Sequence, residues 1–225
     1  DHRDLHLSIR RQRQMCIRDS SNINTSKNRT KVLQELDKED GNLIIPVQKH
    51  TNICKVITDK DSQNIIADAL VTKSEKLILC ILTADCVPLL LHEKKENIIG
   101  AIHAGWKGAK SNIIENTIIK VQELGGKIEN ISIVIGPCIQ QKSYEVGNEF
   151  FENFTLDDNK NRELFVQKSQ RYYFDLPQYC INKIKKCGIK KIDNLNKCTY
   201  ENSNEFFSFR RSLHLNEIDY GRQAN

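Results

Sequence analysis

The stretch KLILCILTADCVPLLLHEKKENIIGAIHAGWKG, residues 76–108, decides the fold because it holds three apolar runs separated by turn residues. The runs at 77–82, 88–92 and 98–102 have the length of strands. They are mostly apolar on both faces, which is typical of central strands covered by helices or by another sheet. The stretch therefore predicts the middle of a buried sheet.

Outside this stretch, short strands and helices alternate along the chain. The clearest helix is expected over 111–124, where apolar residues repeat at helical spacing before Gly125-Gly126. Further strands are predicted at 43–47, 54–58, 69–72, 131–135 and 189–195, and further helices within 25–37, around 149–154 and at 177–187. The alternation predicts an α/β (α+β) fold, a single domain of packed mixed β-sheets flanked by helices.

Composition indicates an ordinary soluble globular protein, with 225 residues, 39% hydrophobic and 28% charged. The net charge of +5 comes from 34 basic and 29 acidic residues without a basic stripe, so no nucleic-acid partner is predicted. The longest apolar run, 77–91, is interrupted by Thr83, Asp85 and Pro88, so no membrane span is predicted. Eight cysteines in a chain of this length, with no recognisable signal peptide, favour reduced thiols and a cytoplasmic location.

The first twenty residues, DHRDLHLSIRRQRQMCIRDS, differ from the rest of the chain. They show no apolar period, and the ending QMCIRDS resembles translated sequencing-adapter sequence. We therefore predict that residues 1–20 are a non-native leader and that residues 21–225 form the catalytic domain. The final GRQAN stops where a closing strand is expected, so the domain is predicted to be truncated at both ends.

Three residues stand where an apolar run meets a turn: His50 in QKHTNI, Cys86 in TADCVPLLL and His103 in AIHAGWKG. Two imidazoles and one thiolate form a three-ligand metal site, and catalytic zinc typically keeps three protein ligands and one open position. Taken singly, Cys86 reads as a buried structural thiol and His50 as a surface histidine. The spacing permits the set without requiring it, because the strand ends with Cys86 and His103 meet or lie apart depending on register.

A group of motifs, in order along the chain, carries a more specific signal. They are ADALVT (67–72), TADCVPLLL (83–91), AIHAGWKGA (101–109), IGPCI (135–139), YEVG (144–147), CT (198–199), and FFSFRRS with GRQA near the end. Together they resemble the YfiH-type laccase-domain family, from about Asn28 to Ala224.

The resemblance implies a CNF/YfiH-like fold, a mononuclear zinc site at His50, Cys86 and His103, and purine-nucleoside chemistry. Members of that family are described as phosphorolysing adenosine, inosine and methylthioadenosine and as deaminating adenosine. They are also named polyphenol oxidase and peptidoglycan editing factor. The expected partners are a purine nucleoside and phosphate, while the oligomeric state is not predicted.

Two motifs depart from the family pattern: QKHT at 48–51 replaces the usual QVHG, and GWKG at 105–108 replaces GWRG. Both keep the metal ligands, but Lys107 lacks the planar fork that Arg offers an anion. Beyond residue 20 the chain has four histidines and no methionine, too few for the copper centres of a multicopper oxidase. Zinc is predicted, with a single copper as a competitor for the same ligands.

Substrate contacts are predicted from a few cationic and aromatic residues. Arg29, Arg210 and Arg211 are candidate phosphate contacts for phosphorolysis, and a solvated ion pair is the ordinary alternative for each. Deamination would instead need a metal-activated water for attack at C6 of adenosine. Asp85, beside the ligand thiol, either orients a ligand, accepts a proton or caps its turn. Trp106 either stacks on a purine or fills a gap.

Three other functions stay open at this stage. Cys86 and His103 alone would suit a metal-free amide hydrolase acting on peptidoglycan precursors, in which His50 has no task. A copper-dependent polyphenol oxidase is a second alternative. In a third, non-enzymatic reading the metal only braces a binding module.

Overall fold

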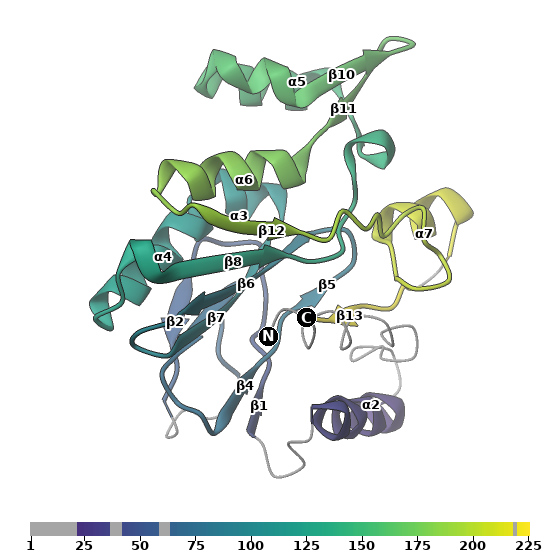
Figure 1. The fold of residues 1–225 in the computed structure, drawn as a ribbon. Helices are drawn as coiled ribbons and strands as arrows, with labels where there is room; N and C mark the ends of the chain where they lie inside the picture. The colour runs from purple at the N-terminus through teal and green to yellow at the C-terminus, as the bar shows by residue number, and fades with distance from the viewer. Residues whose placement is uncertain (1–21, 37–41, 59–63, 218–219) are drawn as a thin grey trace.

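A six-stranded mixed sheet forms the centre of the molecule, a computed structural model that describes residues 22–36, 42–58, 64–217 and 220–225 (Figure 1). The predicted leader, residues 1–20, lies outside the described residues. The strand order is β12 (Lys191–Asn194), β8 (Ile131–Ile135), β6 (Val87–Glu93), β7 (Ile98–Ala104), β3 (Ala69–Thr72) and β2 (Cys54–Val56). The inner strands pair antiparallel and the two edge strands pair parallel. The predicted mixed α/β class is confirmed.

The hairpin β6–β7 settles the register that the sequence left open. Pro88 of β6 lies opposite His103 of β7, and Glu93 lies opposite Ile98 beside the turn. The start of β6 and the end of β7 therefore share one edge of the sheet. Cys86, directly before β6, is brought to the same edge as His103.

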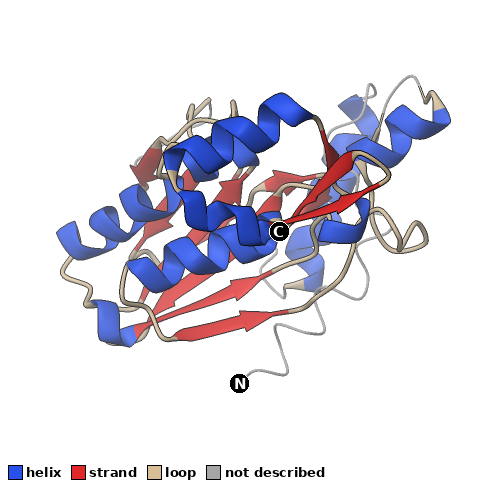
Figure 2. Ribbon diagram, turned by 90° about the horizontal axis from the view of Figure 1, so that it is seen from above, coloured by secondary structure: helices blue, strands red, loops and turns tan. Residues whose placement is uncertain are grey.

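Helices cover one face of this sheet (Figures 1 and 2). They are α3 (Trp106–Lys110), α4 (Ile113–Glu123) and α6 (Leu176–Lys186). The predicted helix over 111–124 begins two residues late because Asn112 has a left-handed φ of 73° and separates α3 from α4. The buried side of α4, with Ile114, Ile118 and Val121, joins the core of the sheet. No helix in the described part of the chain is long and apolar enough to cross a membrane.

An aromatic layer lies beyond these helices. It is formed by α5 (Asn148–Asp157), a 3₁₀ helix (Asn159–Leu164) and a sheet of β9 (Glu145–Val146), β10 (Phe165–Lys168) and β11 (Arg171–Phe174). Phe150, Phe154 and Phe174 pack together with ring centroids 4.6–5.2 Å apart. The β10–β11 hairpin was not predicted. Its turn uses Ser169 and Gln170 at φ 46° and 65°, in place of the usual Asn or Gly.

The predicted strand over 77–82 is wrong in one respect, because it divides between two small sheets. β4 (Leu77–Leu79) pairs with β1 (Asn42–Ile44), and β5 (Leu82–Thr83) pairs with β13 (Gln223–Ala224). Ile81 exchanges backbone hydrogen bonds with Asn225, so the partner of the chain changes there. Helix α2 (Asn22–Glu35) packs on this region through Val32, beside Cys80 and Leu82.

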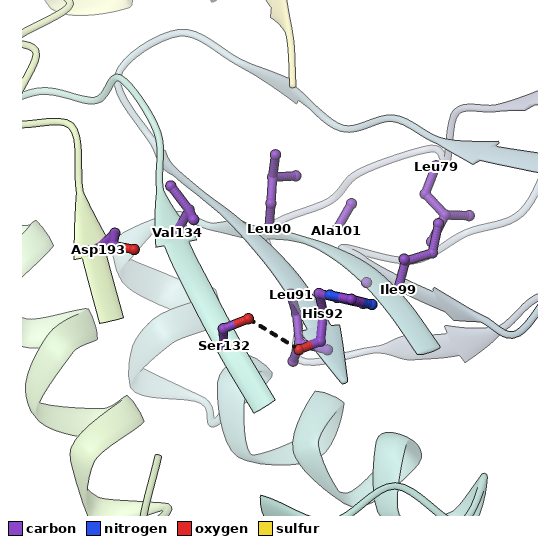
Figure 3. A pocket seen from close by; sticks show the side chains of 10 residues that line it. Leu79, Leu90, Leu91, His92, Ile99, Ala101, Ser132, Val134 and Asp193 are labelled. Carbon is purple, nitrogen blue, oxygen red and sulfur yellow. Dashed lines mark hydrogen bonds between the residues drawn. The ribbon is translucent and has the colours of Figure 1, made fainter. Parts of the chain in front are cut away.

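The face of the large sheet away from the helices carries a hollow of about 580 Å³ (Figure 3). Leu90, Ile99 and Val134 form part of its apolar lining, and His92 and Asp193 add polar groups. These residues alternate along their strands with those that face α4 and α6. None of the predicted site residues lines this hollow.

Candidate metal centre

The three predicted ligands meet at one edge of the large sheet. His50 lies in the loop before β2 with a left-handed φ of 58°, Cys86 precedes β6, and His103 lies near the end of β7. The Cys86 sulfur is 3.7 Å from Nε2 of His50, and the ligand atoms of all three residues lie within 4.8 Å of one another. Because zinc bonds are about 2.0–2.3 Å long, two atoms on one ion are at most ~4.6 Å apart. The donors therefore stand at nearly the spacing that one ion needs.

Asp68 orients two of these ligands, and the sequence reasoning missed it. Its Oδ1 lies 2.8 Å from Nδ1 of His103, which leaves Nε2 of that ring for a metal. The same carboxylate accepts hydrogen bonds from the backbone of His50 at 2.9 Å and of Thr51 at 2.7 Å. It also accepts from the Thr51 hydroxyl and the Lys49 backbone. Asp68 thus fixes the ring of one histidine and the strained loop of the other.

A sequence signal for Asp68 did exist. It lies in Ala67-Asp68-Ala69, at the start of a fully buried strand, and is itself 0% exposed. A carboxylate at such a position needs hydrogen-bonding partners, because burying an unpaired charge is costly. Its presence in an apolar run therefore indicates a polar site nearby.

Gly105 leaves room for His50 and Cys86, two of the predicted ligands. A Cβ atom at this position would lie 2.7 Å from Cδ2 of His50 and 3.1 Å from the sulfur of Cys86. The backbone φ of Gly105 is −69°, so space and not backbone conformation requires glycine here. Gly108 is similar, since its Cβ would come within 2.9 Å of the Thr51 carbonyl oxygen. The glycines of GWKG thus let α3 approach the His50 loop.

The electrostatics of the centre favour a thiolate. Burial by itself raises the pKa of the Cys86 thiol, but the charge of His103 and hydrogen bonds from both histidines lower it to about 6. Burial lowers the pKa of His103, whereas the Cys86 thiolate and Asp68 raise it to about 9. Burial also raises the pKa of Asp68, but hydrogen bonds from His103 and Thr51 outweigh this and lower it. At neutral pH the metal-free centre therefore holds a thiolate next to an imidazolium, and a thiolate is the form that binds metal.

Three of the other predicted residues, Asp85, Arg210 and Arg211, contact one another or the C-terminal segment. Asp85 is buried and accepts hydrogen bonds from the C-terminal segment, including the Arg210 backbone. Arg210 is half-buried, and its guanidinium lies 5.3 Å from the ring centroid of Tyr144. Arg211 donates to the carbonyl oxygens of residues 199, 200 and 206, so it braces this segment internally.

Two predicted substrate contacts, Trp106 and Arg29, lie on helices. Trp106 begins α3 directly after Gly105 and is half-buried, with its ring edge against Phe150 at a centroid distance of 5.1 Å. Lys107 is exposed, and its Nζ lies 5.4 Å from the Trp106 ring. Arg29 is exposed on α2, and within the described residues no contact joins it to the three predicted ligands.

Comparisons with known proteins agree on the family. The sequence model described as multi-copper polyphenol oxidoreductase laccase matches residues 15–225. A protein from Rickettsia conorii named purine nucleoside phosphorylase is 45% identical over 153 residues, which are 67% of this chain and 63% of that protein. A protein of the same name from Bacteroides thetaiotaomicron is 33% identical over 199 residues, 82% of this chain and 74% of that one.

Solved structures resemble this chain over most of its length. The YfiH protein of Bacillus licheniformis superimposes with a TM-score of 0.83 at 25% sequence identity, covering 91% of this chain and 80% of that one. The chain spans less than two thirds of the length of the Rickettsia conorii relative.

Proposed function

The chain belongs to the multi-copper polyphenol oxidoreductase laccase family, which includes YfiH-type proteins, and from this we propose that it is a metal-dependent purine nucleoside phosphorylase. The observation that carries the proposal is the group of His50, Cys86 and His103, oriented by Asp68. The names of relatives that cover much of the chain supply the substrate class.

The donor set fits zinc. Two imidazole nitrogens and a thiolate are ligands that zinc prefers, and a three-ligand set leaves one position open, as in catalytic sites. When bound, zinc would supply a Lewis acid at that open position. Copper competes for the same donors because its intrinsic affinity is higher. In the described part of the chain, this is the one group of three or more such side chains with ligand atoms close enough together to hold an ion, which favours mononuclear chemistry over a multicopper cluster.

In phosphorolysis, an oxygen of phosphate forms a bond to the anomeric carbon of the sugar while the bond from that carbon to the purine nitrogen breaks. The purine leaves with the electron pair and takes up a proton. The guanidinium of Arg210 is the proposed contact of the phosphate, because it is planar, always charged and half-buried. Trp106 is the proposed contact of the base, at the start of α3 beside the ligands. Arg29 and an acid–base role of Asp85 stay predictions.

We propose adenosine, inosine and methylthioadenosine as nucleosides, with deamination of adenosine as a second reaction of the same centre. In deamination the oxygen of water forms a bond to C6, and the amino group leaves that carbon as ammonia. Both reactions are expected to need Cys86 as a metal ligand, so a Cys86→Ala variant tests both. The products, ribose 1-phosphate or inosine, show which of the two reactions takes place.

The experiment compares the zinc-loaded protein with its Cys86→Ala and Cys187→Ala variants. Each is incubated with one nucleoside and phosphate, and the free base, ribose 1-phosphate and inosine are measured by mass spectrometry. Cys187 is a matched control, because it is half-buried at the end of α6 and is not one of the clustered ligands. We expect ribose 1-phosphate from the parent and from Cys187→Ala and none from Cys86→Ala. If a folded, zinc-bound parent makes neither ribose 1-phosphate nor inosine, the proposal is wrong.

A second candidate is the Cys86–His103 amide hydrolase. It is favoured by one observation, the lowered pKa of Cys86 beside the raised pKa of His103, which is the pairing that activates a nucleophilic thiol. His50 separates the two candidates. A His50→Ala variant that loses zinc but still hydrolyses amides of peptidoglycan precursors would favour the hydrolase, whereas joint loss of zinc and phosphorolysis favours the phosphorylase.

A further inference from the structure

Asp85 connects the metal ligand Cys86, its neighbour in the chain, to the C-terminal segment. Its Oδ1 accepts a hydrogen bond from the Thr199 hydroxyl at 2.6 Å. Its Oδ2 accepts one from the Ser208 hydroxyl at 3.0 Å and one from the Arg210 backbone N–H at 2.7 Å. Three donors from two distant stretches of chain thus converge on one buried carboxylate.

The backbone of Asp85 is fixed as firmly as its side chain. Its φ of 86° lies in the left-handed region, which is costly for a residue other than glycine unless the surroundings hold it. Its carbonyl oxygen accepts a hydrogen bond from the Ile139 N–H at 3.0 Å. Asp85 is 8% exposed, and the donors from Thr199, Ser208 and Arg210 occupy both carboxylate oxygens. This arrangement suits a residue that holds others in place better than one that takes a proton from substrate.

Arg210 is the residue in this network that can reach an anion. Asp85 holds its backbone, and its Nη1 donates to the Glu145 carbonyl oxygen at 2.7 Å. The guanidinium lies over the half-buried Tyr144 ring. Burial raises the pKa of the Tyr144 hydroxyl, the charge of Cys86 raises it further, and Arg210 opposes them. Because Asp85 directly precedes Cys86 in the chain and accepts a hydrogen bond from the Arg210 backbone, Arg210 lies close to the predicted metal ligands.

We propose that Asp85 is a positioning residue that sets Arg210 against the metal centre, so that the guanidinium meets the phosphate co-substrate. This inference rests on the proposed phosphorylase function. Through its backbone Asp85 also sets the place of Cys86. One residue therefore fixes the distance between the metal side of the site, formed by His50, Cys86 and His103, and the anion side, formed by Arg210.

The test measures phosphate and zinc separately in Asp85→Asn. Asparagine keeps the size of the side chain but lacks the charge and offers one acceptor atom for three donors. We expect the KM for phosphate to rise about tenfold, with kcat changed less than about threefold and zinc content unchanged. Asp157→Asn, at an exposed ion pair with Lys110, makes the same change of charge and should leave all three values as they are. A fall in kcat at constant phosphate KM, or loss of zinc, would overturn the proposal.

A double variant shows whether Asp85 acts through Arg210. Arg210→Ala alone should raise the phosphate KM more than Asp85→Asn does, and adding Asp85→Asn to it should change the KM by less than about twofold. Effects that multiply would mean that Asp85 acts independently. If Asp85→Asn does not fold, Thr199→Val removes one of the three donors, keeps the charge, and should raise the same KM by a smaller factor.

A separate readout distinguishes this inference from the phosphorylase function. Calorimetric binding of inorganic phosphate to the zinc-loaded protein needs no turnover. If the parent forms no ribose 1-phosphate but binds phosphate about tenfold more tightly than Asp85→Asn, the positioning role holds and the phosphorylase function fails. Equal binding by parent and variant, or no phosphate binding by the parent, overturns the positioning role.

Discussion

Two buried carboxylates, Asp68 and Asp85, organise the two sides of the centre in different ways. The hydrogen-bond partners of the Asp68 side chain are all 17–35 residues away, in the loop that carries His50 and in His103 near the end of β7. Those of the Asp85 side chain are 114–125 residues away, in the C-terminal segment. The group of predicted metal ligands is therefore built within one compact region of neighbouring strands, whereas the proposed phosphate side, around Arg210, is assembled across the fold. This division predicts that metal binding and substrate binding respond to different substitutions.

The largest effect should come from pH and should fall on the metal side. Because the pKa of His103 is about 9 and that of Cys86 about 6, a metal ion must expel the proton of His103 throughout the range between them. Between pH 6 and pH 9, loss of the His103 proton alone should raise zinc affinity about tenfold per pH unit, or about a thousandfold in all. Below pH 6 the affinity should change more steeply with pH, because Cys86 is then protonated as well. Chelator competition at stepped pH measures this. An affinity that does not change between these pH values would contradict the ion pair.

Asp68→Asn should have the next largest effect. It removes the charge that orients His103 and replaces one of the two oxygens that together accept four hydrogen bonds from the His50 loop, so zinc affinity should fall roughly 10- to 100-fold. The unmatched buried donors should also lower the free energy of unfolding by about 1–3 kcal/mol. Metal titration and denaturant unfolding measure the two effects. Asp85→Asn is the comparison variant, and an equal loss of zinc in both would show that the two sides are not separate.

Gly105→Ala should affect the metal side less. The new Cβ would overlap the His50 ring and press on the Cys86 sulfur, so His50 must rotate away while the other two ligands stay. We expect about a tenfold loss of zinc affinity with little change in unfolding free energy. Gly147→Ala is the matched control, because a Cβ there would have no neighbour within 4 Å. Unchanged zinc affinity in Gly105→Ala would mean that His50 is not a ligand.

Arg29→Ala should have the smallest effect. Arg29 is exposed on α2, which packs through Val32 on the region of Cys80 and Leu82. Removing an exposed cation should change stability by no more than about 0.5 kcal/mol and the phosphate KM by less than about twofold. Steady-state kinetics with varied phosphate measures this. A rise of the KM comparable with that of Arg210→Ala would restore Arg29 as a phosphate contact.

The sequence predicted the parts of the fold and site that follow from local pattern. The apolar runs around Cys86 and His103 became the central hairpin, and the three ligands came together as the motifs suggested. The prediction of one strand over 77–82 was wrong because its two halves pair with strands that are distant in the sequence. β4 pairs with β1, and β5 pairs with β13. The β10–β11 hairpin was not predicted, because its turn residues, Ser169 and Gln170, are not the Asn or Gly that usually indicate such a turn.

The roles of the two carboxylates were harder to predict for a physical reason. What a carboxylate does depends on which donors surround it, and the donors to Asp85 lie more than a hundred residues away. No local spacing encodes such a partnership. Asp68 was within reach of sequence reasoning, since a charge at the start of a buried strand requires partners, and its motif had already been noticed as part of the family resemblance.

The long separation between Asp85 and its partners has a consequence for synthesis. A chain emerges from the ribosome with its N-terminal part first. His50, Asp68, Cys86 and His103 therefore all emerge well before Thr199 and Arg210. A nascent chain can gather its metal ligands while Arg210 has not yet been translated. The predicted ligands are thus synthesised before the C-terminal segment that holds Asp85 next to Cys86.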